Sequence, residues 1–211
     1  RLRGNDNPQK YMANIDTIRH SLAHILAAVI KQRYPKAELG TGPIIDNGFY
    51  YDFDFSDGPV PAPEDLADLE NEMKKLIGKH LDFVSEKLSE VEAKNLFKNE
   101  PYKLELMSEL LADKQKLSFY RSENFLDLCA GPHIENTGEI AQESFKLERL
   151  AGAYWKGDEK NKMLTRIYGL AFATKEELTA YETQLEEAKK RDHRILGKQL
   201  KIFTISPLVG A

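Results

Sequence analysis

The fold of this chain is organised around residues 15–33, which read IDTIRHSLAHILAAVIKQR. Apolar side chains recur there at helical spacing and form one wide stripe, made of Ile18, Leu22, Ile25, Leu26 and Val29. The pattern predicts an amphipathic helix that ends before Pro35. His20 and His24 are four residues apart, so they project from one face of this helix, beside small alanines that leave room for a pocket.

A second group of reactive side chains lies far along the chain, in residues 127–133, which read DLCAGPH. This motif holds the only cysteine, Cys129, together with His133. A strand over 125–129 would place Asp127 and Cys129 on one face, because alternate residues of a strand share a face. We therefore expect the two motifs to form the two halves of one site.

Composition limits the class of protein. The 211 residues are 41% hydrophobic and 30% charged, which is typical of a globular protein with one large domain or two small ones. No apolar run is long enough to span a bilayer, so we expect no membrane partner. A single cysteine suits a reducing compartment and predicts a cytoplasmic protein. The net charge of −4 argues against general nucleic-acid binding but allows a local basic patch.

The rest of the chain predicts an α+β fold of antiparallel sheets packed with helices. An Asn47-Gly48 turn leads into a strand whose aromatic side chains alternate, with Phe49, Tyr51, Phe53 and Phe55 on one face. Other patterns predict helices over 64–77, after Ser89 and over 102–111, and strands over 82–88, 117–121, 125–129, 145–149 and 163–168. Residues 150–158 are predicted as a loop, and a capping box at 174–177 begins a long C-terminal linker helix that reaches about residue 199.

The spacing of the reactive residues leaves three interpretations open. Four nitrogen and sulfur donors could form a tetrahedral zinc site, with ligands His20, His24, Cys129 and His133. The motif differs from that of zinc proteases, because Ser21 stands where those have a glutamate base. Without metal, a neutral imidazole could take a proton from water while a lysine stabilises an oxyanion. In a purely structural alternative, these residues are satisfied parts of the core.

Taken together, the motifs resemble the editing region of bacterial-type threonyl-tRNA synthetases. The matching segments occur in family order and cover nearly everything from residue 18 to about 200, namely 18–24, 42–52, 102–103, 127–133, 152–158 and 161–169. The second half, about 117–170, also resembles the module that threonyl- and alanyl-tRNA synthetases share. The resemblance implies that 1–14 link to an N-terminal domain, that 15–173 form the editing domain, and that 174–211 lead toward an aminoacylation core absent from this chain.

The resemblance also implies an activity, the hydrolysis of mischarged Ser-tRNA(Thr). Threonine differs from serine by one methyl group, which a binding pocket discriminates by only roughly 1–3 kcal/mol, so a second site must remove the error. The partner would be the acceptor end of tRNA(Thr). The ligase active site, its ATP and zinc, and the usual homodimer contacts would belong to the absent core.

The family's functional positions fall on six residues here, and Tyr51 is a further candidate that could equally belong to the sheet core. Those implied to be catalytic are His20, His24, Lys103, Cys129 and His133, and those implied to bind substrate are Asp127 and Tyr51. In this interpretation, His20 and Lys103 position or activate the water and the terminal ribose. Asp127 holds the seryl amine, and Tyr51 contacts the terminal adenosine or ribose. The remaining three residues shape the pocket.

Alternatives remain for the cofactor and for the role of the chain. Editing in the threonyl family is expected to need no metal, whereas alanyl relatives bind zinc through the equivalent four donors. The alternatives are therefore a zinc-dependent deacylase of the alanyl type, or a tRNA-binding appendage that is inactive in isolation. Basic residues that could contact tRNA phosphates are Lys156, Lys160, Lys162, Arg166 and the run 189–194, although that run could equally be a solvated helix face.

Overall fold

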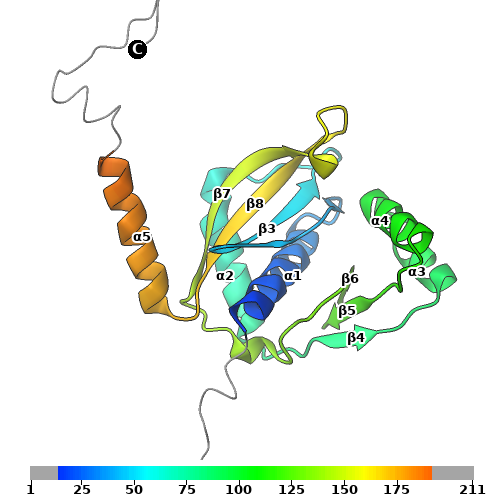
Figure 1. Ribbon diagram of the computed structural model, residues 1–211, viewed down its shortest axis with the longest axis horizontal. Helices are drawn as coiled ribbons and strands as arrows, with labels where there is room; N and C mark the ends of the chain where they lie inside the picture. The colour runs from blue at the N-terminus through cyan, green and yellow to red at the C-terminus, as the bar shows by residue number, and fades with distance from the viewer. Residues whose placement is uncertain (1–13, 192–211) are drawn as a thin grey trace, which may run out of the picture.

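The computed structural model describes residues 14–191, which form two antiparallel sheets packed with helices (Figure 1). The helices are α1 (Ile15–Arg33), α2 (Leu66–Ile77), α3 (Glu90–Leu96), α4 (Pro101–Ala112) and α5 (Lys175–Lys190). The larger sheet has the strand order β1-β3-β8-β7, and β2 pairs with β3. Its strands are β1 (Glu38–Leu39), β2 (Ile44–Ile45), β3 (Gly48–Asp54), β7 (Phe145–Tyr154) and β8 (Met163–Ala171). The smaller sheet contains β4 (Val84–Glu86), β5 (Phe119–Ser122) and β6 (Phe125–Leu128). The predicted α+β class is confirmed.

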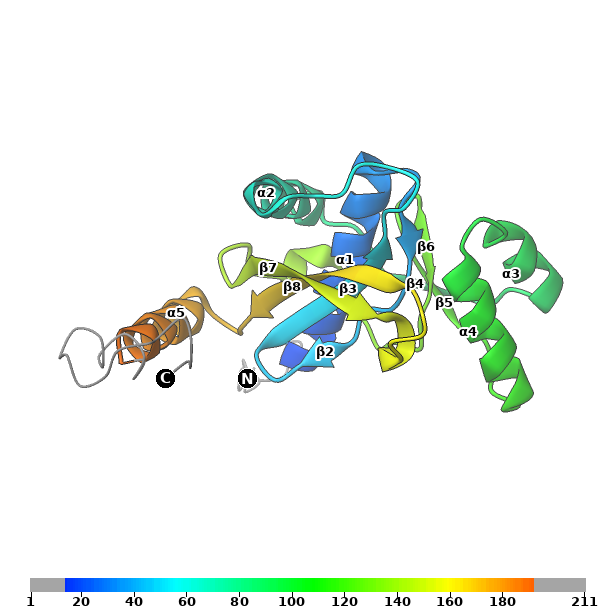
Figure 2. The same cartoon turned by 90° about the horizontal axis from the view of Figure 1, so that it is seen from above.

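Helix α1 forms with the bounds that the sequence predicts, and its apolar stripe is buried. It lies with α2 on one face of the larger sheet, as Figure 2 shows from above. The side chain of Asn14 caps the helix by accepting a hydrogen bond from the Asp16 backbone N–H. Buried Arg19 ties the helix to the end of β8, because its Nε donates to the Ala171 carbonyl at 3.1 Å.

The predicted aromatic face of β3 is confirmed, since Phe49, Tyr51, Phe53 and Phe55 are all buried. Asp52 and Asp54, on the opposite face of this strand, are buried as well. Arg166 of β8 donates twice to Asp52, at 2.7 and 2.8 Å. Burial by itself raises the pKa of Asp54, but hydrogen bonds from Lys162, Ser56 and Tyr102 lower it to about 2. Asp54 therefore stays charged, and both carboxylates are paired with basic side chains beneath this face.

The smaller sheet packs against α3 and α4, away from α2. A separate core cluster joins these elements through Ala93, Phe97, Met107 and Phe119. The strands predicted over 117–121 and 125–129 form as β5 and β6, with slightly different bounds. Glu123, at the turn between them, has a φ of 52°. The predicted strand over 82–88 is shorter, and only residues 84–86 pair with β5.

The prediction of a loop over 150–158 is wrong for its first half. Strand β7 continues to Tyr154 because residues 150–154 pair in register with β8, ending with Tyr154 opposite Met163. A 3₁₀ turn, Trp155–Gly157, follows. Likewise, a 3₁₀ turn over Pro63–Asp65 precedes α2 where the sequence predicts continuous helix.

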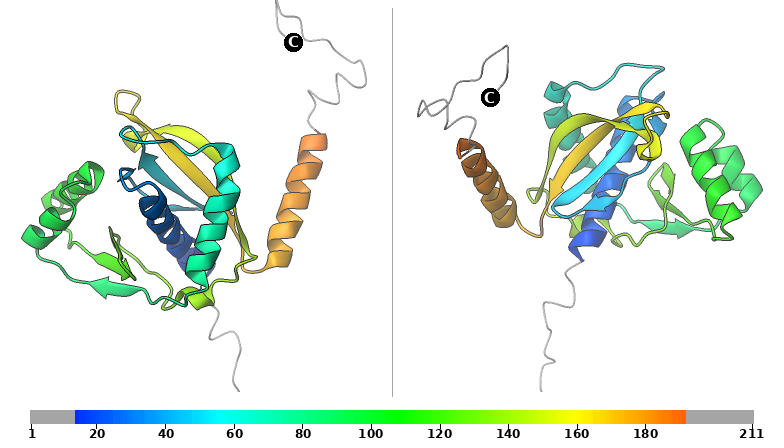
Figure 3. Two further views of the ribbon diagram at one scale, coloured as in Figure 1. Left: turned by 180° about the vertical axis from the view of Figure 1, so that it is seen from behind. Right: turned by 45° about the horizontal axis from the view of Figure 1, so that its top comes forward.

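The C-terminal helix begins at the predicted capping box, where the Thr174 side chain accepts a hydrogen bond from the Glu177 backbone N–H. Figure 3 shows α5 leaving the end of β8 beside the sheet. The expected continuation of this helix to about residue 199, the extended segment over 202–211 and the linker over 1–13 lie outside the described residues. Within residues 14–191, no helix has the length and apolar character needed to cross a bilayer.

The packing of α1 predicts unequal effects for two leucine truncations. Leu26→Ala should lower the free energy of unfolding by about 2–5 kcal/mol, because Leu26 is 0% exposed and its removal leaves a cavity. The matched control Leu96→Ala, on α3, should change it by at most about 0.5 kcal/mol, because Leu96 is 58% exposed. Urea denaturation followed by circular dichroism measures both values, and equal losses would contradict this description of the core.

Candidate functional site

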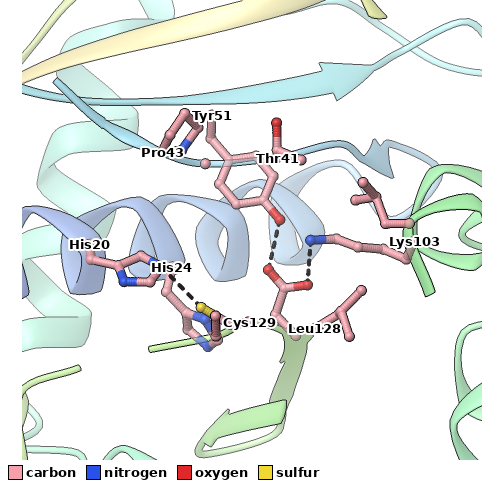
Figure 4. Close-up of a pocket in the computed structure, with 12 residues that line it drawn as sticks. His20, His24, Thr41, Pro43, Tyr51, Lys103, Leu128 and Cys129 are labelled. Atoms are coloured by element: carbon pink, nitrogen blue, oxygen red, sulfur yellow. Dashed lines mark hydrogen bonds and ion pairs between the residues drawn. The ribbon is translucent and has the colours of Figure 1, made fainter. Parts of the chain in front are cut away.

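The two predicted motifs meet at a cavity of about 290 Å³ between α1, β3, α4 and the end of β6 (Figure 4). Six of the seven predicted site residues line it, namely His20, His24, Tyr51, Lys103, Asp127 and Cys129. The seventh, His133, contacts Cys129. The structure therefore brings together residues that lie more than 100 positions apart in the sequence.

A buried ion pair occupies one side of the cavity. The Lys103 ammonium lies 2.6 Å from one Asp127 carboxylate oxygen, and the Tyr51 hydroxyl donates to the other at 2.7 Å. Figure 4 shows Tyr51 and Lys103 both reaching toward this carboxylate. A lysine beside an apolar stripe usually extends to water, but Lys103 is only 2% exposed. Its positive charge is therefore held inside the pocket by Asp127.

Tyr51 belongs to this arrangement through its ring as well as its hydroxyl. Burial raises the pKa of Tyr51 well above its usual value, and the Asp127 charge acts in the same direction. The ring also lies 5.3 Å from the Lys103 ammonium. Gly42 is required beside it, because a Cβ atom there would meet the Tyr51 ring at 2.2 Å. The 41–43 segment thus forms a close-fitting wall of the cavity.

A chain of sulfur and imidazole contacts occupies the other side. The Cys129 Sγ lies 3.0 Å from His20 Nε2 and 3.2 Å from His133 Nε2. The backbone turns sharply after Cys129, where Gly131 has a φ of +66° and a Cβ atom would meet the Tyr120 hydroxyl at 2.5 Å. This turn brings His133 back against the cysteine that precedes it by four residues.

Burial sets the protonation of these groups. It lowers the pKa of His24 to about 4, and with the neighbouring histidines it lowers that of His133 to about 2. Burial also lowers the pKa of His20, although a hydrogen bond to the Pro132 carbonyl opposes the change. All three imidazoles are therefore neutral near pH 7. Burial raises the pKa of Cys129 to about 11, so its sulfur is a protonated thiol and a poor nucleophile.

His24 differs from the other predicted donors. It packs edge-on against two aromatic rings, at centroid distances of 4.8 Å from Phe125 and 5.3 Å from Phe83. Both of its ring nitrogens are buried, and neither has a hydrogen-bond partner among the described residues. The helix face that carries His20 into the pocket thus carries His24 into the aromatic core at its floor.

Three of the four predicted zinc donors converge. The ligand atoms of His20, Cys129 and His133 all lie within 4.8 Å of one another, and His24 is not part of this group. Nitrogen and sulfur ligands of one tetrahedral zinc ion lie roughly 3.5 Å apart. The observed separations of 3.0 and 3.2 Å are close to that value and are also ordinary for hydrogen bonds to sulfur. The three residues therefore fit a zinc ion without requiring one.

Some residues of the site have no distinctive pattern in the sequence. Thr41 and Leu106 line the cavity, but neither belongs to one of the motifs that carry the reactive side chains. Ser21 lies between the two predicted histidines, and its hydroxyl oxygen is 3.1 Å from His133 Nδ1. Only the fold reveals this contact, because the two residues are 112 positions apart.

The basic residues expected to bind phosphate are mostly paired with carboxylates. Lys156 contacts Glu105 at 2.6 Å and also pairs with Glu109. Lys162 lies 2.6 Å from Asp54, and Arg166 is held by Asp52. These ion pairs reduce the positive charge that β7, β8 and their connection offer to a nucleic acid. Of the run 189–194, residues 192–194 lie outside the described part of the chain.

Comparison with known proteins gives a consistent result. Residues 117–168 match the family model of the threonyl and alanyl tRNA synthetase second additional domain. The chain is 47% identical over 201 residues to a threonine--tRNA ligase of Dehalococcoides mccartyi, which covers 95% of this chain and 34% of that protein. It is 52% identical over 192 residues to that of Clostridium tetani and 51% identical over 190 residues to that of Thermotoga neapolitana. These matches cover 90% and 89% of this chain and 29% of each relative. The chain thus spans about a third of the length of these curated relatives.

The buried state of His24 predicts a pH-dependent stability. Its pKa is about 4 in the fold and 6.5 when unperturbed, so the unfolded chain takes up a proton first as the pH falls. The free energy of unfolding should therefore decrease between about pH 6.5 and pH 4, with a contribution from His24 of about 3 kcal/mol. His24→Asn should reduce this decrease by that amount in urea denaturation at the two pH values.

Exposed His80 offers the matched control for that measurement. His80→Asn makes the same substitution on the surface and should leave the pH dependence close to that of the unaltered chain. If His24→Asn showed the same fall in stability as His80→Asn, His24 would not be held neutral by burial.

Proposed function

The chain belongs to the family that carries the second additional domain of threonyl and alanyl tRNA synthetases, and we propose that its cavity hydrolyses the seryl ester of mischarged Ser-tRNA(Thr). The observation that carries this proposal is that one cavity is lined by both a neutral imidazole, His20, and a buried ammonium, Lys103. Ester hydrolysis needs both a proton acceptor for water and a positive charge near the developing oxyanion.

The proposed reaction uses the residues in distinct roles. His20 accepts a proton as water attacks the ester carbonyl carbon, and the Lys103 ammonium stabilises the negative charge that forms on the carbonyl oxygen. The bond between that carbon and the ribose oxygen then breaks, and the proton returns from His20 to the ribose oxygen. Free serine and uncharged tRNA are the products. Cys129 takes no covalent part, because its sulfur is a thiol at neutral pH.

Asp127 supplies the contact for the substrate amine. Its carboxylate already accepts the Tyr51 hydroxyl and faces the Lys103 ammonium. A carboxylate has about four lone-pair positions, so the seryl ammonium can bind while both neighbours stay in place. Tyr51 acts here by holding Asp127, which differs from the contact with adenosine or ribose expected from the family resemblance.

The wider assignment follows the same relatives. We propose residues 15–173 as the editing domain and 174–211 as the helix and linker toward an aminoacylation core. The tRNA(Thr) acceptor end would be the partner. Because Lys156, Lys162 and Arg166 are paired with carboxylates, exposed Lys160 is the better candidate for a phosphate contact on this side of the domain.

A second candidate function is a zinc-dependent deacylase of the alanyl type. It is favoured by the convergence of His20, Cys129 and His133. These three residues would hold the ion, which would supply Lewis-acid activation of water when bound. The His20 and His133 imidazoles are already in the neutral form that metal binding requires, whereas Cys129 would have to lose its proton.

The proposed role of His20 predicts the outcome of a deacylation assay. The chain should release serine from Ser-tRNA(Thr) faster than it releases threonine from Thr-tRNA(Thr). His20→Asn should slow the release of serine by about 10²- to 10⁴-fold, because it removes the proton acceptor. His80→Asn, which alters an exposed histidine outside the cavity, should hydrolyse as the unaltered chain does. An unimpaired His20→Asn variant would exclude His20 as the base, and an inactive unaltered chain would favour a tRNA-binding appendage.

Metal removal distinguishes the two candidate functions. Under the metal-free proposal, treatment with a chelator should leave the rate of Ser-tRNA(Thr) deacylation unchanged, and elemental analysis should find no stoichiometric zinc. A rate that falls on chelation and returns when zinc is added would instead establish the zinc-dependent function. Zinc retained by the unaltered chain and lost from Cys129→Ala would identify Cys129 as a ligand.

A further inference from the structure

We propose that Ser21 is a positioning residue that fixes which nitrogen of His133 carries the proton, and thereby directs the Cys129 thiol proton away from His20. Ser21 is fully buried and contributes its hydroxyl to three contacts at once. The hydroxyl lies 2.9 Å from the Thr17 carbonyl oxygen, 3.1 Å from the Ile134 backbone nitrogen and 3.1 Å from His133 Nδ1.

Counting protons assigns a direction to each contact. A serine hydroxyl has one proton to donate and two lone pairs to accept. The Ile134 N–H can only donate, so it occupies one lone pair. The separation of 2.9 Å from the Thr17 carbonyl is within the usual range for O–H···O bonds, and serine in a helix commonly donates to the carbonyl four residues earlier.

The remaining contact then has to be donated by His133. Its 3.1 Å separation is within the range of N–H···O bonds and longer than is usual for a hydroxyl donor. Because neutral imidazole carries one proton, a proton on Nδ1 leaves a free lone pair on Nε2. That Nε2 faces the Cys129 sulfur at 3.2 Å, so the thiol proton is donated to His133.

The direction of the thiol proton matters for His20 on the other side of the sulfur. Cys129 Sγ is even closer to His20 Nε2, at 3.0 Å, and a thiol has only one proton. If that proton pointed to His20, it would occupy the lone pair that the proposed reaction uses to accept a proton from water. With the proton on the His133 side, a sulfur lone pair faces His20 Nε2. Ser21, acting through His133 and Cys129, therefore sets whether the sulfur donates a proton to His20 or accepts one from it. This consequence rests on the proposed function, whereas the tautomer of His133 does not.

Nitrogen-15 NMR of the histidine rings tests the tautomer directly in the full 211-residue chain. Long-range proton–nitrogen correlations distinguish a protonated ring nitrogen from one with a free lone pair, and the chain has only five histidines to assign. At neutral pH, His133 should be protonated at Nδ1 and unprotonated at Nε2. Protonation at Nε2 in the unaltered chain would overturn the proposal without any variant or activity measurement.

Two serine variants then isolate the role of the hydroxyl. Ser21→Ala removes the acceptor from His133 Nδ1 and should shift the His133 proton to Nε2. Ser144→Ala is the matched control, because Ser144 is also buried and donates its hydroxyl to a backbone carbonyl, that of Ala141, at 2.8 Å. It should leave the His133 signals unchanged. A His133 tautomer that stays the same in Ser21→Ala would overturn the proposal.

Kinetic measurements test the predicted consequence for His20. If the unaltered chain deacylates Ser-tRNA(Thr), Ser21→Ala should lower kcat by about 10- to 100-fold, the usual effect of losing a partner that orients a site residue, with KM nearly unchanged. Ser144→Ala should keep the unaltered kcat. A Ser21→Ala variant with the altered tautomer and full kcat would overturn the link to His20, while an inactive unaltered chain would count against the proposed function and leave the NMR result standing.

Discussion

The architecture of the site depends on the buried ion pair between Lys103 and Asp127. Together with the hydroxyl of Tyr51, it joins α4, the end of β6 and β3, which come from three distant parts of the chain. Moving two charges out of water costs several kcal/mol per ion, so such a pair adds little net stability. Its effect is to constrain position, because loss of either partner would leave the other charge buried and unpaired. The pair therefore fixes how far the smaller sheet and α4 stand from the larger sheet, and the cavity is the space between them.

Desolvation explains why this cavity holds only two formal charges. The burial that makes three imidazoles neutral also keeps the Cys129 thiol protonated, since in each case it disfavours the charged form. Lys103 and Asp127 differ from these groups because they form an ion pair at 2.6 Å. The site thus separates a charged half, suited to a substrate amine and an oxyanion, from a neutral half, suited to accepting a proton. Neither half resembles a thiolate nucleophile, which would need a lowered pKa at the cysteine.

Local patterns were enough to predict α1, the aromatic face of β3 and both site motifs, because each depends on periodicity or spacing within a short segment. Contacts between segments that are far apart in the sequence could not be predicted in this way. Nothing near Asp52 indicates that it is buried, since Arg166, its partner, is 114 residues away. The extension of β7 to Tyr154 was missed because glycine and alanine over 151–153 read as loop, while pairing with β8 makes them strand. The role of Ser21 is hidden for the same reason, because its neighbours in sequence are the histidines and its partner is His133.

The choice between a metal-free site and a zinc site depends on one proton, that of Cys129. Zinc binding by His20, Cys129 and His133 requires the thiolate, and a pKa of about 11 makes that form costly. Zinc coordination would have to offset that cost before any net binding appears. The Nδ1 proton that Ser21 assigns to His133 would orient the ring equally well for a metal or for the thiol proton. The donor set of this cavity therefore fits zinc, whereas the burial of the cysteine opposes the thiolate that zinc binding needs.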